Sequence, residues 1–185
     1  MAKPWTNADG LQVKFANYWN DKSNFVNKAR ALNTDGLVKQ IVIEYDLSRI
    51  AAGTTAYPSD LNNDGTADGF DLDSTYLPAN ASVLRTTVYA TEAAAGGTSI
   101  TVGTYQKDGT AIAATGLVTA TEGVLANLNA AGKRTYGAGT LNAATAGTAG
   151  VGTADAFIAI AATGTFTAGK GYILIEYIDA IGDAA

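Results

Sequence analysis

Two segments of the chain alternate apolar and polar residues with a period of two. They are VKQIVIEYD, residues 38–46, and GYILIEYID, residues 171–179. Successive side chains of a β-strand point to opposite faces of a sheet, so each pattern predicts a strand with one buried face. The residues that would share the buried faces are Ile41, Ile43, Tyr45, Ile173, Ile175 and Tyr177.

Shorter runs of the same kind lie between these two segments, separated by clusters of Gly, Asn and Asp. They are residues 81–91, 98–106 and 155–163. This spacing is typical of a sandwich, and 185 residues suffice for one such domain. Residues 119–132 instead predict a short helix, because Thr119 and Glu122 form a capping-box pattern and Gly132 provides a stop. We therefore expect an all-β fold, an antiparallel, jelly-roll-like β-sandwich with one short helix.

The N-terminal segment shows no sustained period. We expect residues 1–38 to form an extended arm with one short strand near Leu11–Phe15, and residues 39–185 to form the sandwich domain. Polar residues separate the large aromatic residues of the arm, which are Trp5, Phe15, Tyr18, Trp19 and Phe25. Two alternatives remain for these side chains: they join the core of the sandwich, or they anchor the arm on another subunit.

Charge is unevenly distributed along the chain. Residues 1–40 contain six Lys or Arg against three Asp, whereas the remaining residues contain six against 14 Asp or Glu. An acidic body argues against nucleic acid as its partner. The basic arm either lies against an acidic surface or serves only solubility.

The acidic loop SDLNNDGTADGFD, residues 59–71, has the spacing of a calcium-binding loop. Asp60, Asn62 and Asp64 alternate ahead of Gly65, and Asp71 stands where the closing carboxylate would be. Dockerin loops, which it resembles, are flanked by helices, whereas no helical period surrounds this one. The alternative is a pair of tight turns built from Asn, Asp and Gly. A calcium ion here would be a structural staple, and we expect no other cofactor.

The composition excludes several kinds of catalytic site. The chain has no His and no Cys, so neither a Ser-His-Asp triad nor a zinc site of ordinary ligands is available. Glu44 and Glu176 lie in similar strand contexts and could pair as in a glycosidase, but two solvent-facing residues, each followed by a buried Tyr, explain them better. We expect no enzymatic activity.

No apolar run at the start predicts a secretory signal, and none elsewhere is long enough for a membrane helix. We therefore expect synthesis in the cytoplasm and no membrane partner.

Several segments in order carry a resemblance to a known class of protein. They are ADGLQVKF, KQIVIEYDLSRI, the turn-rich loop, YLPANASVLRTTVYATEAAAGGTSITVGTYQKDGT and the closing ATGTFTAGKGYILIEYIDA. From Asp9 onward the chain resembles the small β-sandwich virion proteins of tailed bacteriophages, including marine and cyanobacterial phages, that are called capsid decoration or cement proteins.

The resemblance implies a non-enzymatic structural protein of the virion. Such proteins, often trimers, bind the outside of the capsid and clamp neighbouring subunits of the major capsid protein. We expect the same here, with the arm aromatics as anchors. The alternatives are a tail, fibre or head-spike module that contacts host glycans or proteins and, more distantly, a calcium-stabilised hydrolase that uses carboxylates.

Overall fold

The computed structural model describes residues 5–6, 12–13, 28–32, 38–56, 76–106, 109–142 and 151–178 of the chain. The described elements are strands and two short 3-10 helices. In chain order they are β1 (Trp5–Thr6), β2 (Gln12–Val13), β3 (Lys28–Leu32), β4 (Val38–Asp46), η1 (Leu47–Arg49), β5 (Thr55–Ala56), β6 (Tyr76–Leu77), β7 (Ser82–Gly96), β8 (Ser99–Tyr105), β9 (Ala111–Val118), η2 (Leu125–Asn127), β10 (Arg134–Tyr136), β11 (Ala156–Thr163) and β12 (Phe166–Ile178).

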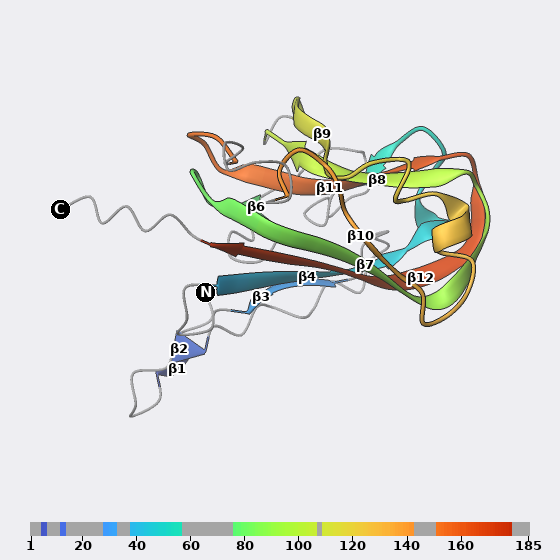
Figure 1. The fold of residues 1–185 in the computed structure, drawn as a ribbon, viewed down its shortest axis with the longest axis horizontal. Helices are drawn as coiled ribbons and strands as arrows, with labels where there is room; N and C mark the ends of the chain where they lie inside the picture. The colour runs from blue at the N-terminus through green and yellow to red at the C-terminus, as the bar shows by residue number, and fades with distance from the viewer. Residues whose placement is uncertain are drawn as a thin grey trace.

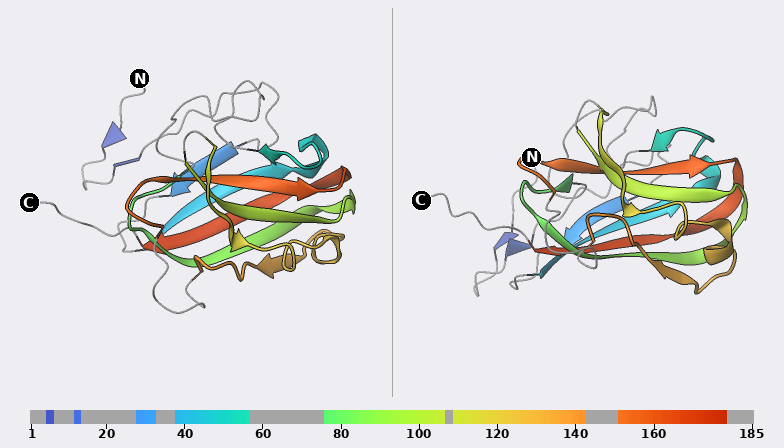
Figure 2. Two further views of the ribbon diagram at one scale, coloured as in Figure 1. Left: turned by 90° about the horizontal axis from the view of Figure 1, so that it is seen from above. Right: turned by 45° about the horizontal axis from the view of Figure 1, so that its top comes forward.

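Two five-stranded antiparallel sheets form two layers, as Figures 1 and 2 show. We call the sheet with strand order β10-β7-β12-β4-β3 the first sheet. The second sheet has the order β5-β11-β8-β9, with β6 also paired to β11. The prediction of an all-β antiparallel sandwich is confirmed.

The alternation in β4 and β12 fixes which face of the first sheet is buried. The two strands pair without a register shift from Lys170 opposite Asp46 to Ile178 opposite Val38. The predicted inward residues are all buried, and they are Ile41, Ile43, Tyr45, Ile173, Ile175 and Tyr177. They pack in one core with Ile100, Val102, Ile158 and Ile160 of the second sheet. Burial of these apolar side chains is the main favourable term that holds the two layers together.

The edge of the second sheet beside β11 is made of two separate short strands. Thr55 and Ala56 of β5 pair with Ala161 and Ile160, while β6 pairs with Ala156 and Phe157 farther along the same strand. Both run antiparallel to β11, so together they occupy the position of one interrupted strand. The acidic loop belongs to the sequence between them and lies outside the described residues.

The helix predicted over residues 119–132 is wrong. The capping contacts do form, because Glu122 accepts hydrogen bonds from the backbone N–H of Thr119 at 3.0 Å and from its hydroxyl. They close a turn rather than begin a helix, because the backbone that follows bonds to the second sheet. Ile100 N–H donates to Gly123 O, and Leu125 N–H donates to Thr98 O, both at 2.9 Å. Only η2, of three residues, is helical there.

Strand pairing also occurs within the predicted arm. Trp5 and Thr6 of β1 pair with Val13 and Gln12 of β2. The strand β3 pairs along β4 from Lys28 opposite Glu44 to Leu32 opposite Gln40. The predicted boundary after residue 38 therefore assigns to the arm a strand that belongs to the first sheet.

Candidate interaction surface

Most of the residues predicted to bind a metal or a partner lie outside the described part of the chain. These are Asp60, Asn62, Asp64 and Asp71 of the acidic loop, and Phe15, Tyr18, Trp19 and Phe25 of the arm. The backbone of Trp5 lies in β1. The calcium loop and the aromatic anchors therefore stay predictions. Within the described ranges, no group of three or more Asp and Glu residues is arranged to hold a metal ion.

The two glutamates considered as a catalytic pair lie on neighbouring strands but not beside each other. Glu44 of β4 pairs with Tyr172, whereas Glu176 of β12 pairs with Gln40. The offset of four positions corresponds to about 13 Å along a strand, more than the spacing of glycosidase carboxylates. Tyr45 and Tyr177, which follow them, are buried, so Glu44 and Glu176 lie on the outward face of the sheet, where the Glu176 side chain keeps 17% of its accessible surface.

The outward face of the first sheet carries three aligned rows of side chains across its strands. Residues directly opposite each other in antiparallel strands lie on the same face of a sheet. The first row crosses β10, β7, β12 and β4 as Arg134, Tyr89, Tyr172 and Glu44. The second row crosses the same strands as Tyr136, Thr87, Leu174 and Val42. The third row crosses β7, β12 and β4 as Arg85, Glu176 and Gln40. We call this set of residues the tyrosine face.

The tyrosine face carries three tyrosine side chains that are partly exposed. Tyr89, Tyr136 and Tyr172 retain 42%, 48% and 40% of their accessible surface. Tyrosine combines a large apolar ring with a polar hydroxyl, and Tyr and Arg are enriched at protein interfaces. These features make the tyrosine face a candidate contact surface.

Polar contacts hold part of this face in one arrangement. The Arg85 guanidinium contacts the Glu176 carboxylate through Nε at 2.7 Å and Nη2 at 2.6 Å, and Gln40 Nε2 donates to the same carboxylate at 3.1 Å. The Cζ atoms of Arg85 and Arg134 lie 5.9 and 5.8 Å from the ring centre of Tyr136, within range of a cation–π interaction. The network therefore links four strands.

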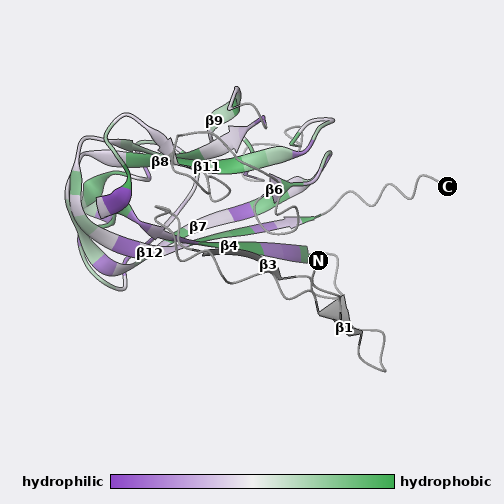
Figure 3. Cartoon of the chain, turned by 180° about the vertical axis from the view of Figure 1, so that it is seen from behind, coloured by the Kyte–Doolittle hydropathy of each residue, from purple (hydrophilic) through white to green (hydrophobic). Residues whose placement is uncertain are grey.

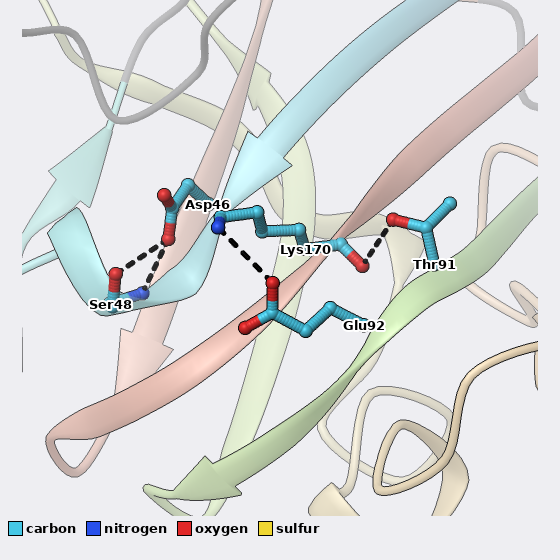
Figure 4. A network of polar contacts seen from close by, with 5 residues as sticks. All are labelled: Asp46, Ser48, Thr91, Glu92 and Lys170. Atoms are coloured by element: carbon cyan, nitrogen blue, oxygen red, sulfur yellow. Dashed lines mark hydrogen bonds and ion pairs between the residues drawn. The ribbon is translucent and has the colours of Figure 1, made fainter.

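A second polar cluster lies where β4 ends, and Figure 4 shows its contacts. Lys170 Nζ lies 3.1 Å from the Glu92 carboxylate, and the Thr91 hydroxyl donates to Lys170 O at 3.1 Å. The hydrogen bond to Glu92, with the charges of Glu92 and Asp46, raises the pKa of Lys170. Asp46 accepts hydrogen bonds from the N–H and hydroxyl of Ser48 and so caps η1. These contacts give every residue of the cluster a structural role.

The strand patterns predict that Glu176 faces solvent, but they do not indicate which residues of other strands share its surface. That information lies in the pairing of strands far apart in the sequence, such as β10 with β7. The sequence shows only that tyrosines occur in these segments, and it does not indicate that they gather on one surface.

Comparison of the chain with protein family models, with curated proteins and with solved structures gives no match. Among the described residues, no helix has the length and apolar character to cross a membrane.

Proposed function

We propose that this protein is a structural component of a phage virion that binds the outer surface of the capsid and stabilises contacts between major capsid protein subunits. On this proposal it is a non-enzymatic decoration, or cement, protein. It is made in the host cytoplasm and resides on the capsid as a homo-oligomer. The sequence resemblance supports the proposal, and the order of the strands supports it further.

The strand order is the observation that carries the proposal. When β4 is counted as the first strand and the interrupted β5 and β6 as the second, β12 is the eighth. In this count, the first sheet contains strands one, eight, three and six in that order, with the extra strand β3 beside strand one. The second sheet contains strands two, seven, four and five in that order. Two nested Greek keys give this order, so we propose that the sandwich is a jelly roll, an architecture used by viral capsid proteins.

A fold alone does not imply a function, so the proposed capsid binding must be explained by particular contact residues. We propose that Trp5, Phe15, Tyr18, Trp19 and Phe25 anchor the chain on the capsid. Each would contribute about 2 kcal/mol if it is buried there.

The test is the amount of this protein in purified virions. We expect a copy number comparable to that of the major capsid protein, measured by quantitative gel densitometry, together with binding of the purified chain to capsids that lack it. The variant Trp19→Ala should weaken that binding, while Ile112→Ala, on the exposed edge strand β9, should not. Absence from virions and from capsids would refute the proposal.

The tyrosine face favours a second candidate, a tail, fibre or head-spike module that binds host glycans. Tyr89 and Tyr172 lie directly opposite each other, and exposed aromatic rings provide apolar surface for a sugar ring. This candidate predicts a low copy number per virion and glycan binding that Tyr172→Ala abolishes. A high copy number without glycan binding would exclude it.

A further inference from the structure

Two arginines lie together at the β10 side of the tyrosine face. Residues 41–185 contain only six Lys or Arg against 14 Asp or Glu, and two of the six, Arg85 and Arg134, are on the neighbouring strands β7 and β10. Both are exposed, and both approach the ring of Tyr136. The face therefore gathers cationic groups on an otherwise acidic domain, which favours an anionic ligand.

The two arginines differ in how far their charge is already balanced. Arg85 contacts the Glu176 carboxylate through both Nε and Nη2. Within the part of the chain that the structure describes, Arg134 makes no ion pair, and its guanidinium group contacts the ring of Tyr136 instead. A guanidinium group has five N–H donors in a planar fork, so Arg134 has donors to offer to a ligand.

An aromatic platform lies next to Arg134 on the same face. Tyr89 of β7 lies directly opposite Arg134, and Tyr172 of β12 lies directly opposite Tyr89. The Cβ atoms of directly opposite residues are about 5 Å apart. A ligand that lies on the two tyrosines is therefore within reach of the Arg134 side chain.

We propose that Arg134, Tyr89 and Tyr172 bind a carboxylated saccharide, such as a uronic acid or sialic acid residue of a glycan. The apolar face of the sugar ring lies on the tyrosines, and the carboxylate accepts paired hydrogen bonds from the Arg134 guanidinium group. This inference rests on the glycan-binding candidate described above, and it adds the class of sugar and the residue that recognises it.

The dimensions of the face favour a saccharide over a protein partner. The three rows span about 13 Å along the strands, which accommodates a short oligosaccharide but not a protein interface of standard size. The first row continues from Tyr172 to Glu44 and then to Lys28 of β3. The strand β4 lies three strands from β10, about 14 Å away, so screening by salt keeps Glu44 from opposing an anion at Arg134.

The test measures which saccharides the full chain binds. The probes are short oligomers of galacturonic acid and of sialic acid, each as the free acid and as the methyl ester, together with oligoglutamate. NMR titration of isotope-labelled protein up to about 10 mM ligand should show saturable binding of at least one free acid, with shifts in β7, β10 and β12. The methyl ester should bind about tenfold more weakly, because it lacks the charge that Arg134 pairs with. Oligoglutamate, which lacks the sugar ring, should also bind more weakly.

Two charge variants provide the matched comparison. Arg134→Gln should weaken binding of the free acid about tenfold or more and leave binding of the methyl ester unchanged. Lys133→Gln removes the same charge from the neighbouring residue, whose Nζ donates to Ala126 O at 2.6 Å and Asn129 Oδ1 at 2.8 Å, and it should weaken binding less than about twofold. Arg134→Lys keeps the charge without the paired donors and should recover only part of the binding. Circular dichroism checks that each variant is folded.

The possible failures separate this inference from the proposed functions. Equal binding of the free acid and its ester, equal binding of oligoglutamate, or equal losses in the two Gln variants would each overturn the inference. Glycan binding that does not require the carboxylate, but that Tyr172→Ala abolishes, would leave the glycan-binding candidate standing. Absence of binding to every saccharide would overturn both. None of these measurements uses capsids, so none bears on the decoration proposal.

Discussion

The two sheets of the sandwich reach burial in different ways. In the first sheet, β4 and β12 alternate over most of their length between buried large apolar residues and partly or fully exposed residues on the outward face. In the second sheet, half of the residues of β11 are alanine, and the strand is buried on both faces over most of its length. Figure 3 shows the difference, since β11 is apolar over most of its length while β7 and β12 carry hydrophilic segments.

The second sheet depends on small residues that allow close approach. A Cβ atom added at Gly103 of β8 would meet the backbone of Ala113 and Ala114 in β9. Ala159 of β11 is fully buried with Tyr105 in a cluster separate from the main core. Burial raises the pKa of Tyr105, and its hydrogen bond with Thr55 opposes the rise. The first sheet should therefore be sensitive to loss of volume, and the second to its addition.

The largest effect is expected from Ile173→Ala in the first sheet. Ile173 is fully buried between the layers, so its truncation leaves a cavity and should lower the free energy of unfolding by about 2–5 kcal/mol. Leu174→Ala is the matched control. Leu174 follows Ile173 on β12 but points outward, so its truncation should lower the free energy of unfolding by less than about 1 kcal/mol. Urea denaturation of dilute protein measures both. Equal losses would contradict the assigned faces.

A smaller loss is expected from Gly103→Ala in the second sheet. The added methyl group collides with the backbone of β9, so we expect a loss of about 1–3 kcal/mol. Ala114→Val adds more volume at an exposed position of β9 and should change stability by less than about 0.5 kcal/mol. If Gly103→Ala is neutral under the same denaturation assay, the second sheet is not limited by close packing.

The smallest effect is expected from Glu122→Gln in the turn that links the sheets. Burial acts to raise the pKa of Glu122, but hydrogen bonds from the Thr119 side chain and backbone outweigh it, and the pKa is lowered. The carboxylate thus stabilises the fold above the ordinary pKa of 4.5, and this contribution is lost as the pH falls through the lowered value. The variant should be less stable by under about 1 kcal/mol at pH 7.

Thermal melting between pH 7 and pH 3 checks this sign. The difference in Tm between wild type and Glu122→Gln should shrink as the solution becomes acidic. A difference that grows on acidification would show that the hydrogen bonds do not favour the charged form.

The difference between the two sheets also explains which strands could be predicted from the sequence. The strands β4 and β12 follow from alternation alone, and their inward residues are those predicted. The strands β9 and β10 were not predicted. Alanine and glycine give β9 little alternation, and β10 is only three residues long. Their positions are set by pairing with β8 and β7, which local sequence does not encode.

The missed helix shows a local signal that tertiary contacts override. Thr119 and Glu122 interact as their spacing predicts, yet the chain after Gly123 bonds to the second sheet rather than to itself. The tyrosine face was missed for a related reason. The sequence predicts that Glu44 and Glu176 face solvent, but the rows exist only through the register of four strands, one of which, β10, was not predicted.

The interrupted edge of the second sheet has a practical consequence. Ala56 and Tyr76 are held on β11 opposite Ile160 and Phe157, three positions or about 10 Å apart. The 19 residues between them therefore leave and re-enter the sheet edge at nearly the same place. Extra length at such a point adds little closure entropy, because that cost grows only logarithmically. This gap is thus a natural point at which to insert a foreign peptide.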